Sequence, residues 1–527
     1  MKRKMKRPRL DVNLGELDKV LDQACEAPMS EPDCNKIKTA LHALAELVEA
    51  RRRQTEKTKA VVGEAAEKNP EQNPEQNPEQ NPEKKPEEQP KGHGRKPAAA
   101  YEGAVKVAVP HAELNSGDAC PECPKGKVYT QKEPKLLVRI VGQPPLAATV
   151  YELERLRCNA CGLIFTASTP EGVGPEKFDE TAVAMMAQLK YGSGMPFNRV
   201  ENLERLLGIP LPASTQWDEM EEAAELLKPA MDELIRAAAQ GELVHNDDTG
   251  MRVLKMERPP GDDRTGVFTS GIVSKLAEPD GERTIALFFT GPKHAGENLG
   301  VVLGHRTAGL APPIQMCDAL SRNTAKLSPG ILILLANCLA HGRRQFVDIA
   351  ENFPEECLHV LEKLGEVYGN DAAARERGLT PEQRLAFHRE RSGPVMEGLH
   401  GWCEQQLAQK KTEPNSGLGK AIAYLLRHWK PLTLFLRQAG APLDNNICER
   451  AIKRAVLHRK NALFYRTLNG AGVGDLFMSL IHTCDLNGVN SFDYLTELLR
   501  HPLELQSSPA EWRPWNYRAA IPATRAV

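Results

Sequence analysis

A carboxylate surrounded by cations distinguishes residues 443–470. Glu449 lies there among six basic residues: Arg450, Lys453, Arg454, Arg459, Lys460 and Arg466. In phosphodiester chemistry, carboxylates hold divalent metal ions, whereas the phosphate backbone is neutralised by Arg and Lys. An acid among cations on a helix-like segment therefore suits a site that holds a metal ion and a polyanion together.

Two further acids occupy positions from which they could join Glu449. Asp247 and Asp248 lie in a strand-like segment, and Asp318 directly follows another. Two-metal phosphoryl transfer requires carboxylates from separate elements, and strand ends can bring them together. Because neighbouring side chains of a strand point to opposite faces, we expect only one of Asp247 and Asp248 to be a ligand. The alternative reading is that each acid merely caps a turn.

The elements that must position these acids follow a recognisable order. Residues 242–254, 265–275 and 283–291 read as strands, 294–305 as a helix and 312–320 as a strand. Residues 331–353 read as a strand that runs into a helix. We interpret the order as three strands, a helix, a strand, a helix and a strand, which is that of a ribonuclease-H-like α/β fold. A helical stretch over 351–440 then precedes the helix of Glu449.

Residues 175–240 are helical in pattern, with a break at 208–214. They resemble a helix, a tight turn and a second helix capped by Ser214 or Thr215. A DNA-binding helix-turn-helix is one interpretation, and an ordinary helical hairpin is the other.

Two CxxC pairs, Cys120 with Cys123 and Cys158 with Cys161, indicate metal. Each pair offers two thiolates from one turn, and two pairs complete the tetrahedron that zinc prefers. The segments 135–140 and 149–158 between the pairs look like strands, as in a zinc ribbon with a long hairpin. A redox use would need only one pair, so we expect structural Zn²⁺.

The N-terminal part differs from the rest. Ile37, Leu41, Leu44 and Val48 follow coiled-coil spacing, although two heptads also fit a short packed helix. A proline-containing repeat of four residues follows and is an extended linker. We expect these segments: 1–68 basic tail and helical or coiled-coil module, 69–95 linker, 96–170 zinc ribbon, 171–240 helix-turn-helix-like region, 241–350 first part of the core, 351–440 helical insertion, 441–500 catalytic helix and completion of the core, and 501–527 tail.

Composition narrows the class of protein. The chain has 527 residues and a formal charge of −2, which neither favours nor excludes a nucleic-acid partner. No run is long and apolar enough to span a membrane, and the basic N-terminus is not followed by the apolar stretch of a secretory signal. We therefore expect a cytoplasmic protein.

Over about residues 92–500 the chain resembles transposases of the insertion-sequence-66 type. The motifs that carry the resemblance are GHGRKP, the two CxxC pairs, NDDTG, CLAHGRRQF and DNNICERAIKRAVLHRKNALF. This family is similar to other DDE transposases, whose ribonuclease-H-like core is interrupted by a helical insertion before the glutamate. Asp248 stands where the family usually has glutamate, and Ala319 and Leu320 follow Asp318 where glycine and tyrosine are common.

The resemblance implies a function and a set of site residues. It implies metal-dependent cleavage of transposon ends and strand transfer into target DNA, with two Mg²⁺ (or Mn²⁺) ions held by Asp247, Asp318 and Glu449. We expect basic residues near these acids to bind double-stranded DNA: Arg343, Arg344, Arg450, Lys453, Arg459 and Lys460. A homo-oligomer and accessory proteins of the same element are also expected. His341 either assists the site or satisfies a local hydrogen bond.

Two alternatives differ in their chemistry. A metal-dependent nuclease or recombinase would cut without joining. A non-catalytic DNA-binding protein would use only the zinc ribbon and the helix-turn-helix, and would survive loss of Asp247 or Glu449.

Overall fold

The computed structural model describes residues 106–521 except 124, 133–136, 138, 141–142, 160, 162 and 257–263. The expected N-terminal helical module and linker lie outside the described residues. Residues 106–147 belong to one compact unit and 148–521 to another. The strands are β1 Arg155–Arg157, β2 Ile164–Thr166, β3 Leu243–Gly250, β4 Val253–Lys255, β5 Phe268–Glu278, β6 Gly281–Gly291, β7 Ile314–Cys317, β8 Leu334–Asn337 and β9 Tyr465–Thr467.

Helices make up most of the rest. The α-helices are α3 Glu180–Ala187, α4 Phe197–Leu206, α5 Ala213–Ala238, α6 Ala295–Leu303, α7 Leu339–Val347, α8 Pro354–Glu376, α9 Pro381–Arg391, α10 Gly393–Ala408, α11 Gly417–Arg427, α12 Trp429–Leu432, α13 Asn446–Ala462, α14 Leu468–Leu486, α15 Ser491–Arg500, α16 Pro502–Ser507 and α17 Tyr517–Ala520. A π-helical turn, η2 Gln188–Gly192, and two 3₁₀ turns, η3 Leu434–Leu436 and η4 Pro509–Trp512, complete the set. Among the described residues, no helix has the length and apolar character needed to cross a membrane.

A five-stranded sheet in the order β6-β5-β3-β7-β8 forms the centre of the larger unit. β3 pairs antiparallel with β5 and parallel with β7, and β7 pairs parallel with β8. Three antiparallel strands followed by two parallel ones, with α6 between them, are compatible with a ribonuclease-H-like core. The helix expected before the last strand is absent, because 318–333 form a loop. The serine, asparagine, proline and glycine residues of this loop favour turns, and α7 follows β8 instead.

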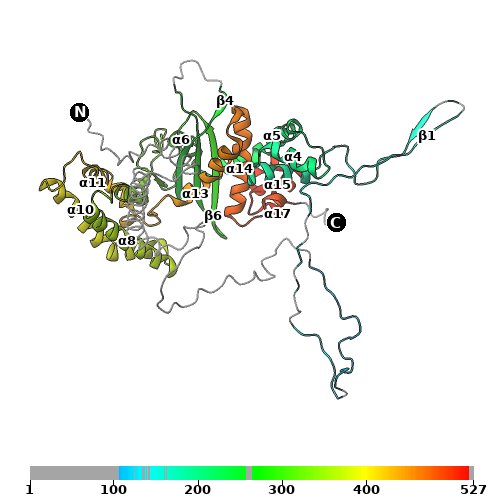
Figure 1. Ribbon diagram of the computed structural model, residues 1–527, viewed down its shortest axis with the longest axis horizontal. Helices are drawn as coiled ribbons and strands as arrows, with labels where there is room; N and C mark the ends of the chain where they lie inside the picture. The colour runs from blue at the N-terminus through cyan, green and yellow to red at the C-terminus, as the bar shows by residue number, and fades with distance from the viewer. Residues whose placement is uncertain are drawn as a thin grey trace, which may run out of the picture. The chain divides into compact units, whose positions relative to one another are not determined.

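Helices cover both faces of the sheet (Figure 1). Gly271 of β5 lies under Ile452 and Cys448 of α13, and any larger residue there would collide with Ile452. The next residue toward the N-terminus, Ser270, accepts a hydrogen bond from Asn298 of α6 on the opposite face. Alternation along the strand thus places α13 and α6 on different faces.

In the described part of the chain, the outer edge of β6 has no neighbouring strand and is covered by α14 instead. Side chains spaced four residues apart on α14 accept the backbone N–H groups of β6: Asp475 binds Thr290, Ser479 binds Phe288, Thr483 binds Ala286 and Asn487 binds Thr284. A strand edge left open would invite pairing with another chain. The polar stripe on a buried helix is therefore explained by the sheet edge that it covers.

The helical insertion packs on the other edge of the sheet. α7, α8, α10 and α11 share one apolar core with Ile314 and Met316 of β7 and Ala336 next to them in β8. The chain leaves the core after Cys338 and returns at Leu443, where the Leu443 carbonyl accepts the Leu339 N–H at 2.9 Å. The two ends of the insertion are therefore adjacent.

The segment before the core is helical as expected, but its details differ. α5 begins at Ala213 with Pro212 as its N-cap residue, so neither Ser214 nor Thr215 caps it. Glu201 of α4 accepts the Ala213 N–H instead. The exposed surface of the first turns of α5 is acidic, with Asp218, Glu221 and Glu222. DNA reading by this helix pair stays a prediction, and such a surface would repel phosphate.

Candidate active site

The central strand and its parallel neighbour bring two acids together. Asp247 lies in β3, and Asp318 comes directly after β7. The side-chain amide of Asn323 donates to both carboxylates, at 3.2 Å to Asp247 and 2.7 Å to Asp318. Two carboxylates that share a single donor are near neighbours. The loop 318–333 therefore helps to build the site, because it places the Asn323 side chain between the carboxylates of Asp247 and Asp318.

Strand alternation separates Asp247 from Asp248. Asp247 pairs with Gly271, which faces α13, whereas Asp248 pairs with Ser270, which faces α6. Asp248 is engaged on that other face, 2.7 Å from Nδ1 of His294. Asp247 thus lies on the same face of the sheet as the helix that carries Glu449.

Glu449 lies in the first turn of α13, and a buried asparagine fixes the start of this helix. Asn445 donates from its amide to the Asn246 carbonyl at 3.1 Å, and its side-chain oxygen lies 2.9 Å from Nδ1 of His245. Both partners belong to β3 and directly precede Asp247 in sequence. The hydrogen bonds therefore tie the glutamate's helix to the strand of the first aspartate.

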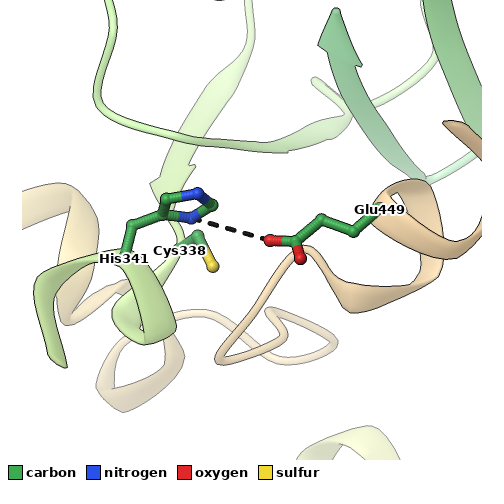
Figure 2. Close-up of side chains that lie close together, drawn as sticks. All are labelled: Cys338, His341 and Glu449. Atoms are coloured by element: carbon green, nitrogen blue, oxygen red, sulfur yellow. Dashed lines mark ion pairs between the residues drawn. The ribbon is translucent and has the colours of Figure 1, made fainter. Parts of the chain in front are cut away.

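The remaining neighbours of Glu449 come from the start of α7 (Figure 2). Nδ1 of His341 lies 3.8 Å from a Glu449 carboxylate oxygen, and Cys338 lies close to both. These three side chains could surround a metal ion, but a cysteine ligand must be a thiolate. Burial raises the pKa of Cys338 to about 12, and its sulfur accepts the Asn445 N–H. Without a metal ion, Cys338 is therefore a neutral thiol that accepts a hydrogen bond, and His341 is the polar neighbour of Glu449.

The pKa of Asp247 is shifted by its burial and by the acids near it. The pKa of Asp247 is raised to about 7: burial is the largest cause, the charges of Asp318, Asp248 and Glu449 also raise it, and the hydrogen bond from the backbone N–H of Asp248 lowers it. Like charges placed this close favour a proton or a cation between them. The two aspartates offer carboxylate oxygens, which Mg²⁺ and Mn²⁺ prefer as ligands. The residues present thus fit a divalent ion of this class.

The expected phosphate-binding residues occupy different surroundings. Arg450, Lys453 and Lys460 are exposed along α13, and within the described chain no ion pair engages them. Arg459 instead donates to the hydroxyl of Thr249 and to the carbonyl of Gly250, so it ties α13 to the end of β3. On α7, Arg344 is exposed and Arg343 is half-buried.

The four cysteines expected to bind zinc occupy two turns. Cys120 and Cys123 lie in a turn closed by hydrogen bonds with Gly126 at 2.9 and 3.1 Å. Cys158 and Cys161 lie in the connection between β1 and β2, where the Cys158 N–H donates to Leu163. β1 is shorter than the expected strand, and residues 137, 139 and 140 are outside any strand. The first pair belongs to the smaller unit and the second to the larger.

Comparison with known proteins shows the family of the chain. A family model described as "Transposase IS66 family" matches residues 176–472, more than half of the chain. The chain belongs to the IS66 transposase family. The matched range contains Asp247, Asp318 and Glu449, together with the whole helical insertion. Membership of the IS66 family supports a transposase role, and it implies DNA binding and the use of divalent metal.

Similar curated proteins come from Sinorhizobium fredii (strain NBRC 101917 / NGR234). The uncharacterized protein y4hP is 26% identical over 392 residues, which cover 70% of this chain and 68% of the relative. The uncharacterized protein y4jD is 27% identical over 376 residues, which cover 69% and 71%.

Sequence reasoning missed several residues of the site. Asn323 joins the two aspartates, and Asn337 donates to the Asp318 backbone carbonyl at 3.2 Å. Both asparagines are buried, which is unusual for this residue type unless its amide is satisfied. Burial cannot be seen in the one-dimensional pattern, so no sequence signal pointed to them.

Proposed function

We propose that the protein cleaves DNA at the ends of its mobile element and joins those ends to target DNA. The observation that carries the proposal is that Asp247 and Asp318 share the Asn323 amide, while Glu449, on the helix over the same face of the sheet, is near enough for its charge to raise the pKa of Asp247. Family membership supports a transposase role, and the acids give that role a chemical centre.

The three acids share one role in the proposed reaction, which is to hold metal ions. Asp247, Asp318 and Glu449 would hold two Mg²⁺ or Mn²⁺ ions. When bound, such ions supply a nucleophile at neutral pH and neutralise charge on the leaving oxygen. Asn323 holds the first two carboxylates in place, and Asn445 holds the helix of the third. Positioning of this kind keeps the ligands ready before DNA arrives.

Exposed cations on α13 are proposed to bind the DNA backbone. Glu449, Lys453 and Lys460 share one face of the helix, because their spacings of four and seven residues are whole helical turns. Successive phosphates of a DNA strand beside Glu449 would thus contact Lys453 and then Lys460. Arg450 lies next to Glu449. Arg459 is proposed as a tether between α13 and β3 that also lends positive charge. Arg343 and Arg344 are proposed as further DNA contacts.

The decisive experiment uses the purified full chain, labelled element ends, target DNA and Mg²⁺ or Mn²⁺. Joined products are expected from the wild type, and Asp247→Asn should produce neither cleavage nor joining. Asp248→Asn is the matched control, because it changes the same charge on the opposite face and should retain the reaction. Cleavage without joined products would favour a nuclease instead. Equal activity of Asp247→Asn and wild type would refute the proposed centre.

A structural Zn²⁺ ion held by Cys120, Cys123, Cys158 and Cys161 is proposed separately. Metal analysis of the full chain should find zinc, and Cys123→Ser should lose it. Cys403→Ser is the control, because this buried cysteine lies in the insertion core. Zinc content unchanged by Cys123→Ser would contradict the site.

A further inference from the structure

An unusual turn follows the catalytic helix. α13 ends at Ala462, and Leu463 has φ +69° and ψ −39°. The Phe464 N–H donates to the Ala462 carbonyl at 2.9 Å. This bond closes a γ-turn of the rare form with positive φ, which is strained for any residue with a side chain. Glycine or asparagine is the usual choice at such a helix end, so leucine is a costly residue here.

Burial does not compensate for the strain. Leu463 is 64% exposed and Phe464 is 37% exposed. A lone exposed leucine on a protein surface requires no explanation. An exposed leucine in a strained conformation, with an exposed aromatic residue beside it, does require one. Strain of this kind persists where function selects it.

The turn is held rigidly from both sides. The Leu463 N–H donates to the Arg459 carbonyl, and the Tyr465 N–H donates to the Arg252 carbonyl, both at 2.9 Å. Tyr465 is buried and stacks on His458 of α13, with ring centroids 4.3 Å apart. Leu463 and Phe464 are thus presented to solvent by a fixed support.

Exposed basic residues surround the turn. Lys460 precedes it, Arg466 follows it in β9, and β9 pairs with β4, which places Arg252 and Lys255 nearby. In the part of the chain that the structure describes, none of these four cations has an acidic partner within ion-pair distance. Exposed apolar side chains ringed by unpaired cations match nucleic acid, because phosphates bind the ring while bases accept the apolar centre.

We propose that Leu463 and Phe464 form a wedge that enters a base step of the DNA and unstacks it. The proposal rests on the proposed function, since it assumes that DNA runs beside Glu449. Leu463 follows Glu449 by fourteen residues, about 21 Å along a helix. At roughly 3.4 Å per base pair, the wedge reaches a step at most about six base pairs from the cleaved phosphate. Unstacking there would make the duplex end easier to bend and open for cleavage.

The test uses duplexes of the element end with 2-aminopurine placed in turn at each of the first positions from the cleavage point. Full-length protein is added without divalent metal, so that no strand is cut. Binding is followed by fluorescence anisotropy, and unstacking by 2-aminopurine intensity. The wild type should raise the intensity several-fold at one position within about six base pairs.

Leu463→Gly is the informative variant, because it relieves the strain while removing the wedge. Its thermal midpoint should be unchanged or higher, and its unstacking signal should be lost. Phe464→Ala should weaken the signal. Lys410→Gly relieves an exposed positive φ of +55° elsewhere and should leave the signal unchanged. Leu503→Ala, which removes an exposed leucine from α16, should do the same.

The outcomes separate this proposal from the function that it rests on. Wild-type binding and metal-dependent cleavage without any unstacking would overturn the wedge alone. A wild type that binds no duplex would overturn both. A change of oligomeric state in Leu463→Gly, with unstacking retained, would make the turn an interface between copies and overturn the wedge.

Discussion

Asp247 in the central strand and Asp371 in the helical insertion are both largely removed from water, yet their surroundings are opposite. Around Asp371 the protein supplies two cations and a hydrogen-bonded histidine: Arg375 lies at 2.8 Å, Arg384 at 2.5 Å and His388 at 3.1 Å. Burial alone would raise the pKa of Asp371, but these partners outweigh it and lower the value to about 2. Around Asp247 the protein supplies further acids, and the pKa is about 7.

The difference separates a structural acid from the acid that we propose to be catalytic. The charge of Asp371 is neutralised by Arg375 of α8 and Arg384 of α9, so this acid joins two helices of the insertion and needs no added cation. Asp247 is left uncompensated by the described chain, which is the condition of a ligand that waits for a cation. The role of a buried acid therefore follows from the charges that the fold places near it. Substitutions of Asp247 and Asp371 should reveal the difference.

The largest effect is expected on catalysis. Asp247→Asn keeps the shape of the side chain but removes one proposed metal ligand, and should lower cleavage by about 10³-fold or more, equivalent to at least about 4 kcal/mol of the barrier. Asp371→Asn should lower it far less in protein that remains folded. Rates are measured on labelled element ends below the unfolding temperature. Similar losses for both variants would remove the distinction.

Stability should show the reverse order. Asp371→Ala leaves a buried histidine and two arginines without their partner, and should lower the free energy of unfolding by about 3–5 kcal/mol. Glu376→Gln, on an exposed position of the same helix, is the control and should have little effect. Urea unfolding followed by the fluorescence of Trp402 and Trp429, both in the insertion, provides the measurement. A loss below about 1 kcal/mol for Asp371→Ala would contradict the structural role.

The pH dependence of stability should have opposite signs for the two acids in metal-free protein. The folded pKa of Asp371 is below its ordinary value of 3.8, so its stabilisation is complete above about pH 4 and is lost as the pH falls toward 2. The folded pKa of Asp247 is above 3.8, so its contribution falls as the pH rises from about 4 to 7. Melting curves in EDTA should show Asp247→Asn gaining stability over the wild type across this second range. Parallel curves would contradict the raised pKa.

The smallest effect is expected at the shared donor. Asn323→Ala removes the amide that joins Asp247 and Asp318, and should lower the rate or the apparent Mg²⁺ affinity by about tenfold. The adjacent Thr324→Ala should change neither. Because the aspartates themselves remain, higher Mg²⁺ should partly restore the rate of Asn323→Ala, and a loss that no Mg²⁺ concentration relieves would argue against a positioning role.

The sequence predicted the order of the core strands well, because β5 and β6 are rich in β-branched and aromatic residues between turns, and β7 and β8 are short segments next to turns. It also placed Glu449 on a helix after an insertion. It could not choose between Asp247 and Asp248, since that choice depends on which face α13 covers. The role of Asn323 depends on the path of a loop, and the partner of Arg459 depends on how α13 meets β3. Neither leaves a periodic signal.

The distance along the chain between the acids has a consequence for synthesis. The hydrogen bonds that tie the start of α13 to β3 include one between Asn445 and His245, which are 200 residues apart. At roughly 5–20 residues per second, the ribosome needs about 10–40 s to add the third acid after the first has been made. During that interval the nascent chain contains Asp247 and then Asp318 but lacks Glu449. If the three acids form the proposed centre, the emerging chain is unable to cut DNA until its insertion has been made and the chain has returned to the sheet.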